Sequence, residues 1–210
     1  MKPPLPRLLL ITDSTVCTDL PGVVAAALAG GVRHVLLREK GMAAGPLTLL
    51  ARTLRALTAA WGAHLLIHDR VDVALAVGAD GVQLPENGLA TVEARRLWAH
   101  GLVGRSCHTV AGACQALQAG ADFVTLSPLF ATPSHPETPP LGLARLAAMR
   151  ASIPGPVLAL GGIRRDNIAE AMSTGVDGIA LIRGILDTRD PCLAARTLLA
   201  LMDEGLPVPG

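Results

Sequence analysis

The sequence predicts a single α/β domain, a closed (β/α)₈ TIM barrel, from three observations. First, four segments share one form, in which a glycine, a small or β-branched residue and a polar residue precede an apolar strand: 31–37, 78–84, 120–126 and 175–181. Second, four other apolar strands alternate with them along the chain: 8–12, 64–68, 102–106 and 157–160. Third, helical stretches separate the strands, which is typical of parallel βαβ units. Eight such units favour a closed barrel, and no Gly-x-Gly-x-x-Gly follows the first strand to indicate a Rossmann fold.

The helical stretches follow the strands in regular order. We expect them at 23–29, 46–61, 71–77, 91–100, 111–119, 143–152, 167–173 and 191–203. In each of the four repeated segments, the glycine is suited to end the preceding helix, and the polar residue is suited to turn the chain into the strand. The predicted domain spans 1–210, with the core barrel at 8–190 and a frayed tail at 206–210.

The composition excludes several classes of protein. Of the 210 residues, 50% are hydrophobic, which is enough for one large core, and the formal net charge of +1 does not indicate a nucleic-acid partner. The four cysteines form no Cys-x-x-Cys pair, so neither a disulfide framework nor a zinc site is predicted. The first apolar run, 8–11, is too short to cross a membrane. We therefore expect a cytoplasmic protein without membrane contact.

Polar residues gather where the predicted strands end. Barrel enzymes keep their active sites at the carboxyl ends of the strands. The candidates for substrate binding are Arg38, Lys40, His68, Asp69, Ser106 and Ser127, and His108 is a candidate for proton transfer. Such basic, hydroxyl and imidazole groups suit a small anionic substrate. The alternatives stay open: 38–40 as a salt-bridged rim, 68–69 as a helix cap, Ser106 as a turn cap and His108 as a structural histidine.

Two later strands end in glycine. Gly161 and Gly162 follow the seventh strand, and Arg183 and Gly184 follow the eighth. Glycine lets bare backbone N–H groups approach a ligand, so these four residues are predicted to bind phosphate, with ordinary tight turns as the alternative. The segment 130–141 holds four prolines and cannot be a helix, so we expect a functional loop that carries His135.

These stretches together resemble the thiamine phosphate synthase/TenI superfamily of small (β/α)₈ barrels. The matching segments run in order through the chain: LLITD at 9–13, LREKG at 37–41, HDRVDVAL at 68–75, ADGVQLP at 79–85, GRSCHT at 104–109, GADFV at 120–124, LGGI at 160–163 and GVDGI at 175–179. The resemblance implies a role in thiamine biosynthesis and a small-molecule thiazole phosphate as the partner. A homo-oligomer is compatible with it.

The synthase branch of that superfamily joins a pyrimidine pyrophosphate to a thiazole phosphate with Mg²⁺. The resemblance implies that Arg38, Lys40 and Asp69 match its ligands. However, Leu36 stands where that branch has Gln, and His68 stands where it has Asn. No Asp occurs from 81 to 93, and no Lys follows Lys40. These departures count against the Mg²⁺-dependent reaction, because such a site needs its carboxylates and cations.

The TenI branch is similar to the chain at 70–72, 82–85 and 104–106, and it includes thiazole tautomerases. Our main prediction is therefore a metal-independent thiazole tautomerase without a cofactor. Pro128 stands at the family's catalytic histidine, so His108 or His135 would move the proton. The alternatives are a thiamine phosphate synthase, for which Mg²⁺ would be the cofactor, and a non-catalytic binding or regulatory protein of the thiamine pathway.

Overall fold

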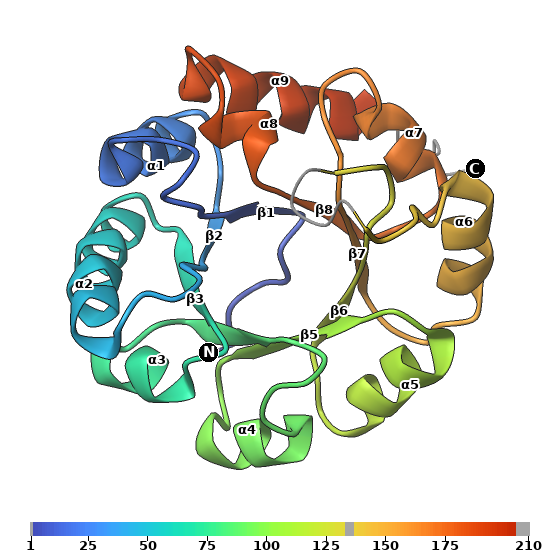
Figure 1. Cartoon of the computed structure of the whole chain (residues 1–210), viewed down its shortest axis with the longest axis horizontal. Helices are drawn as coiled ribbons and strands as arrows, with labels where there is room; N and C mark the ends of the chain where they lie inside the picture. The colour runs from blue at the N-terminus through green and yellow to red at the C-terminus, as the bar shows by residue number, and fades with distance from the viewer. Residues whose placement is uncertain (1, 133–136, 205–210) are drawn as a thin grey trace.

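The computed structural model describes residues 2–132 and 137–204, and these form a closed barrel of eight parallel strands (Figure 1). The predicted TIM barrel is confirmed. The strands are β1 Leu8–Ile11, β2 His34–Leu37, β3 His64–His68, β4 Gly81–Leu84, β5 Leu102–Cys107, β6 Phe123–Leu126, β7 Val157–Leu160 and β8 Gly178–Leu181. Each pairs with the next in the chain, and β8 closes the barrel on β1, with Leu9 in register with Ala180. All carboxyl ends therefore meet at one face.

Helices surround the strands in Figure 1. They are α1 Leu20–Ala29, α2 Ala44–Ala60, α3 Val71–Val77, α4 Thr91–Leu97, α5 Val110–Gln118, α6 Leu143–Ala151, α7 Ile168–Ser173, α8 Arg183–Leu186 and α9 Pro191–Glu204. The short α8 was not predicted, because 178–184 reads as one strand and its glycine end. Across residues 2–132 and 137–204, no helix has the length and apolar character needed to cross a membrane.

The helix α4 ends earlier than predicted. We expected it to reach His100, but it stops at Leu97. The guanidinium of Arg95 donates hydrogen bonds to the carbonyls of Trp98 and Gly101, at 2.9 and 2.8 Å. The chain after the helix is therefore held in a turn by a side chain of the helix itself.

The strands are apolar on both faces, as expected of a parallel sheet covered by helices. In β1, Leu8 and Leu10 belong to the large cluster between the sheet and the helices, whereas Leu9 and Ile11 belong to a smaller cluster. The smaller cluster consists of Leu9, Ile11, Leu36, Leu66, Leu102, Phe123, Leu158 and Ala180, all on strands. Alternating residues of β1 thus supply both the helix-facing layer and the barrel interior.

Three of the four repeated joints carry the same clamp at the amino-terminal end of the barrel. Asp80, Asp122 and Asp177 accept hydrogen bonds from the backbone N–H groups that begin the neighbouring strands, at 2.8 to 2.9 Å. An arginine from an even-numbered helix binds each aspartate, and it also donates to the carbonyl of the glycine two residues before that aspartate: Arg55 to Asp80 and Gly78, Arg95 to Asp122 and Gly120, and Arg150 to Asp177 and Gly175. Each clamp ties two strands to one helix.

The amino-terminal segment crosses this same end of the barrel (Figure 1). The ammonium of Lys2 forms an ion pair with Asp122, and the carbonyl of Pro4 lies 3.0 Å from Nε2 of the buried His34. The carbonyl of Arg7 accepts the backbone N–H of Ile179 at 2.8 Å. Because this end is occupied by clamps and chain, the open end lies at the carboxyl termini of the strands.

The clamp predicts unequal effects for two aspartates. Replacing Asp122 with alanine removes the acceptor for Val103 and leaves Arg95 without its carboxylate, so we expect a loss of about 2–4 kcal/mol in the free energy of unfolding. Asp203 is the control, because its ion pair with Arg7 is exposed and Asp203→Ala should cost less than about 1 kcal/mol. Urea unfolding measures both, and equal effects would contradict the structural role of the clamp.

Candidate functional site

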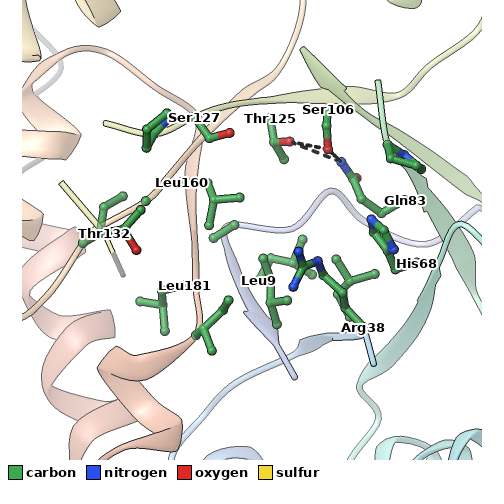
Figure 2. Close-up of a pocket in the computed structure, with 18 of the residues that line it drawn as sticks. Leu9, Arg38, His68, Gln83, Ser106, Thr125, Ser127, Thr132, Leu160 and Leu181 are labelled. Carbon is green, nitrogen blue, oxygen red and sulfur yellow. Dashed lines mark hydrogen bonds between the residues drawn. The ribbon is translucent and has the colours of Figure 1, made fainter. Parts of the chain in front are cut away.

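A cavity of about 440 Å³ opens at the carboxyl ends of the strands. Its apolar lining includes Leu9, Ile11, Leu36, Leu160, Ala180 and Leu181. Its polar lining is Arg38, Lys40, His68, Gln83, Glu86, Asn87, Ser106, His108, Thr125, Ser127, Thr132, Thr138, Arg164 and Arg183. Figure 2 shows Arg38 and His68 on one side of this cavity and Leu160 and Leu181 on the other. An apolar pocket with a few converging polar groups is the usual form of a small-molecule site.

The cations after β2 are not part of a salt-bridged rim. Between them, Glu39 accepts hydrogen bonds from the Thr12 hydroxyl at 2.7 Å and from the backbone N–H of Ser14 at 2.9 Å. Arg38 and Lys40 line the cavity instead, and neither side chain forms a hydrogen bond or ion pair with any residue of 2–132 or 137–204. Burial lowers the pKa of the Arg38 guanidinium, with Asp13 and Glu39 opposing the effect. A half-buried charge without a partner is costly, so it favours an anionic ligand.

Two more cations reach the cavity from β7 and β8. Arg164 follows β7, and within the described part of the chain its guanidinium also has no hydrogen-bond or ion-pair partner. Arg183 follows β8 and faces Asp187 at 3.2 Å, but both side chains are about half exposed. The four cations therefore come from β2, β7 and β8, which lie on either side of β1 in the barrel.

His68 lies beside Arg38 at the end of β3 (Figure 2). Burial lowers the pKa of its imidazole to about 4, and the nearby Arg38 and Lys40 add to the effect while Asp69 opposes it. The imidazole is therefore neutral at pH 7, because that pH lies well above its pKa. It can donate or accept a hydrogen bond in the cavity, but it does not add a fifth positive charge.

Three polar side chains from β4, β5 and β6 meet in the cavity wall (Figure 2). The amide Nε2 of the buried Gln83 lies 3.3 Å from the hydroxyls of both Ser106 and Thr125, which are 3.4 Å from each other. Gly104 leaves room for this arrangement, since a Cβ there would lie 1.9 Å from Oε1 of Gln83 and 2.4 Å from the ring of Phe123. The trio can hydrogen-bond the polar atoms of a ring held between apolar side chains.

The turn after β7 is packed tightly against the loop after β6. Gly161 and Gly162 have φ values of 106° and 65°, which disfavour any residue with a side chain. A Cβ on Gly162 would lie 2.6 Å from the carbonyl of Ala131. Asn167 fixes the turn by donating from Nδ2 to the carbonyl of Gly162 at 3.0 Å and by accepting the backbone N–H of Arg164 at 2.7 Å.

His108 is tied to the rim of the cavity. Its Nδ1 lies 3.1 Å from the carbonyl of Ser127, and its Nε2 lies 3.7 Å from a carboxylate oxygen of Glu86. Arg105 donates to the carbonyls of Glu86 and Leu89 and so holds the loop that carries Glu86. His108 thus has partners on both ring nitrogens and is half exposed.

The structure brings most of the predicted site residues together. The cavity lining includes Arg38, Lys40, His68, Ser106, His108, Ser127, Gly161, Gly162 and Arg183. Gly184 is not in the lining, although Arg183, its neighbour in α8, is. Asp69 is not in the lining either; it has a φ of 63°, and a Cβ on Gly88 would lie 2.9 Å from its Oδ1. His135 lies outside the described residues.

Among the lining residues that are not sequence candidates, Thr125 and Arg164 are instructive. Thr125 lies inside the apolar run of β6, where a lone threonine looks like a core residue. Its position two residues before Ser127, on the same face of a strand, is the signal that could have found it. Arg164 comes two residues after Gly162 and is one of a pair of arginines. Only the turn held by Asn167 shows which of the two reaches the cavity.

The cavity offers few carboxylates that could hold a metal ion. Among the described residues that line the cavity, Glu86 is the one aspartate or glutamate. Within residues 2–132 and 137–204, no group of three or more His, Cys, Asp or Glu side chains is placed to hold a metal ion.

The contacts around Gly104 predict that the polar trio depends on this glycine. Gly104→Ala would force Gln83 and Phe123 to move, so we expect a loss of about 1–3 kcal/mol in the free energy of unfolding. Gly45→Ala on α2 is the matched control, because a Cβ there meets nothing within 4 Å and should leave stability unchanged or slightly raised. Thermal unfolding of both variants decides, and a neutral Gly104→Ala would contradict the close packing.

Comparison with known proteins gives one consistent answer. The family model described as thiamine monophosphate synthase (TMP-TENI) matches residues 8–185. A protein of Geobacter sulfurreducens, provisionally named a thiamine-phosphate synthase, is 51% identical over 93% of each chain. The thiamine-phosphate synthase of Chloroflexus aurantiacus is 39% identical over 93% of this chain and 92% of its own. The solved thiamine phosphate pyrophosphorylase of Pyrococcus furiosus is 34% identical, with a TM-score of 0.88 over 96% of this chain and 97% of its own.

These relatives correct one prediction and support another. The prediction of a metal-independent thiazole tautomerase is wrong, because the similar proteins are named as synthases and none of these findings indicates the TenI branch. They support the prediction of an enzyme, in place of the non-catalytic binding protein. Because the family model matches residues 8–185 of its 210 residues, the chain belongs to the thiamine monophosphate synthase family.

Proposed function

We propose that this protein is a thiamine-phosphate synthase, which joins a pyrimidine diphosphate to a thiazole phosphate and releases pyrophosphate. Relatives of that name cover nearly the whole chain. The observation that carries the proposal is the pair of cavity cations after β2, Arg38 and Lys40, which have no hydrogen-bond or ion-pair partner among the described residues. Unpaired cations in an apolar cavity suit substrates that bring several negative charges.

The chemistry of the coupling explains what the cations would do. The bond between the pyrimidine's methylene carbon and the diphosphate oxygen breaks, and the thiazole nitrogen forms a new bond to that carbon. The pyrophosphate leaves with the electron pair of the broken bond, so negative charge grows on it in the transition state. Fixed positive charges beside that group stabilise the transition state more than the ground state. Arg38 and Lys40 are the cations we assign to this role.

The second phosphate has a separate place in the cavity. Gly161, Gly162, Arg164 and Arg183 line the side formed by β7 and β8. We assign the phosphate of the thiazole to this side, since glycine turns expose backbone N–H groups and the two arginines supply charge. This arrangement would leave the two heterocyclic rings between the two anionic groups.

The rings would lie over the centre of the barrel. Leu9, Leu160 and Leu181 offer an apolar surface there, and Gln83, Ser106 and Thr125 offer hydrogen-bonding groups (Figure 2). This combination suits a flat heteroaromatic ring with polar atoms at its edge. The neutral His68, next to Arg38, can bond either the ring or the diphosphate.

Mg²⁺ is the cofactor that the family resemblance implies, and the residues of this cavity do not fit it. Mg²⁺ takes oxygen ligands, chiefly carboxylates and substrate phosphates. The single lining carboxylate, Glu86, is about half exposed and faces His108 at 3.7 Å. Asp69, which matches a family ligand, is not in the lining of the cavity. We therefore assign no step of the reaction to a metal ion.

The assignment of Arg38 predicts the effect of removing its charge. Arg38→Gln should lower the kcat/KM of coupling by about 10- to 100-fold, as expected for the loss of a charge-assisted hydrogen bond to the leaving group. Arg196→Gln is the matched control, because Arg196 is exposed on α9, away from the cavity lining. Thiamine phosphate formed from the two substrates is measured by chromatography.

Two results would contradict this proposal. If the unaltered protein forms no thiamine phosphate from the two substrates, with or without added Mg²⁺, the protein is not a synthase. If the protein is active and Arg38→Gln is as active as Arg196→Gln, the synthase function stands but the role of Arg38 is wrong.

A further inference from the structure

We infer that this cavity binds the diphosphate group directly through its own cationic side chains, without a divalent metal ion. The inference rests on the proposed function, since it concerns the diphosphate of the proposed substrate. It differs from what the family resemblance implies, because Mg²⁺ is expected there. The evidence for this inference is the set of charged side chains that line the cavity.

The lining has far more positive than negative charge. Of the lining residues that the structure describes, four bring a fixed positive charge, Arg38, Lys40, Arg164 and Arg183, and one brings a negative charge, Glu86. A metal ion that bridges a diphosphate to a protein needs carboxylates to hold it. Cationic side chains need none, because they bond the phosphate oxygens themselves.

The neighbourhood of Arg38 would repel a second cation. Arg38 and Lys40 belong to the same strand end, two residues apart, and both influence the imidazole of His68. Three carboxylates act on these side chains from nearby, Asp13 and Glu39 on Arg38 and Asp69 on His68, but none of the three lines the cavity. Glu39 accepts from Thr12 and Ser14, and Asp13 accepts from Thr15. Arg38 is half-buried and Lys40 is exposed. A divalent ion placed inside the cavity here would meet two like charges, and that of Arg38 is screened poorly. A diphosphate at the same place would meet two opposite charges.

The apolar residues around Arg38 also favour a bound diphosphate over a bound metal ion. Leu9 lies near Arg38 (Figure 2), and Leu36 also lines the cavity. Apolar walls lower the effective dielectric constant around the half-buried guanidinium. The interaction between a phosphate and a guanidinium gains from the lower effective dielectric constant.

Calorimetry with inorganic pyrophosphate tests the inference on the whole protein. Titrations are run in excess EDTA and again with Mg²⁺ in place of EDTA. We expect binding in EDTA that is at least as tight as in Mg²⁺, because Mg²⁺ removes free pyrophosphate from solution. Lys40→Gln should weaken the binding in EDTA by at least about tenfold, and Arg196→Gln should leave it within about twofold.

Each outcome of this titration is informative. Binding that occurs in Mg²⁺ alone would overturn the inference, and so would the absence of binding in both solutions. Binding in EDTA that Lys40→Gln and Arg196→Gln weaken equally would also overturn it, because the pyrophosphate would then lie elsewhere. Circular dichroism of both variants shows whether each keeps its fold.

The coupling assay separates this inference from the proposed function. If thiamine phosphate forms at the same rate in EDTA and in Mg²⁺, both stand. If it forms only in Mg²⁺, the protein is a synthase and the metal-free binding of the diphosphate is wrong. If pyrophosphate binds in EDTA and no thiamine phosphate forms under either condition, the metal-free site stands and the synthase function fails.

Discussion

The barrel depends on aspartates at its amino-terminal end that join strands to helices. Asp80, Asp122 and Asp177 each accept the backbone N–H of the first or second residue of a neighbouring strand, and each is held by an arginine from a helix. Because a buried backbone N–H without a partner is costly, these contacts fix where each strand begins relative to the next. The register set at this end decides which residues emerge at the other, including His68 and Gln83 from the clamped pair β3 and β4.

The two ends of the barrel use positive charge in opposite ways. At the clamped end, Arg55, Arg95 and Arg150 have carboxylate and carbonyl partners, so their charges stabilise the fold. At the open end, Arg38 and Lys40 line the cavity and find no such partner within residues 2–132 and 137–204. The sequence alone shows arginines at both ends, and only their contacts separate structural from functional ones. This contrast is the physical basis for a site that receives anionic substrates.

Much of the fold could be predicted from the sequence because its repeats are regular. The Gly-x-Asp joints and the alternating apolar runs mark the strands, and the strand ends point to Arg38, His68 and Ser106. The details that depend on tertiary contacts could not be predicted. Glu39 looks like a partner for its neighbours in sequence, but it bonds to Thr12, which follows the adjacent strand β1. Thr125 looks like a core residue until Gln83 and Ser106 are seen beside it. The tautomerase prediction is wrong because missing metal ligands do not by themselves indicate a different reaction. They are equally consistent with a different way of binding the same anion.

The central claim is that the unpaired cations of the open end bind a diphosphate. The most direct measurement is a crystal structure of the protein soaked with inorganic pyrophosphate in the presence of EDTA. The account predicts a pyrophosphate inside the cavity, with its oxygens within hydrogen-bonding distance of the side chains of Arg38 and Lys40. An empty cavity at saturating pyrophosphate, or a pyrophosphate bound only on the outer surface of the helices, would contradict it.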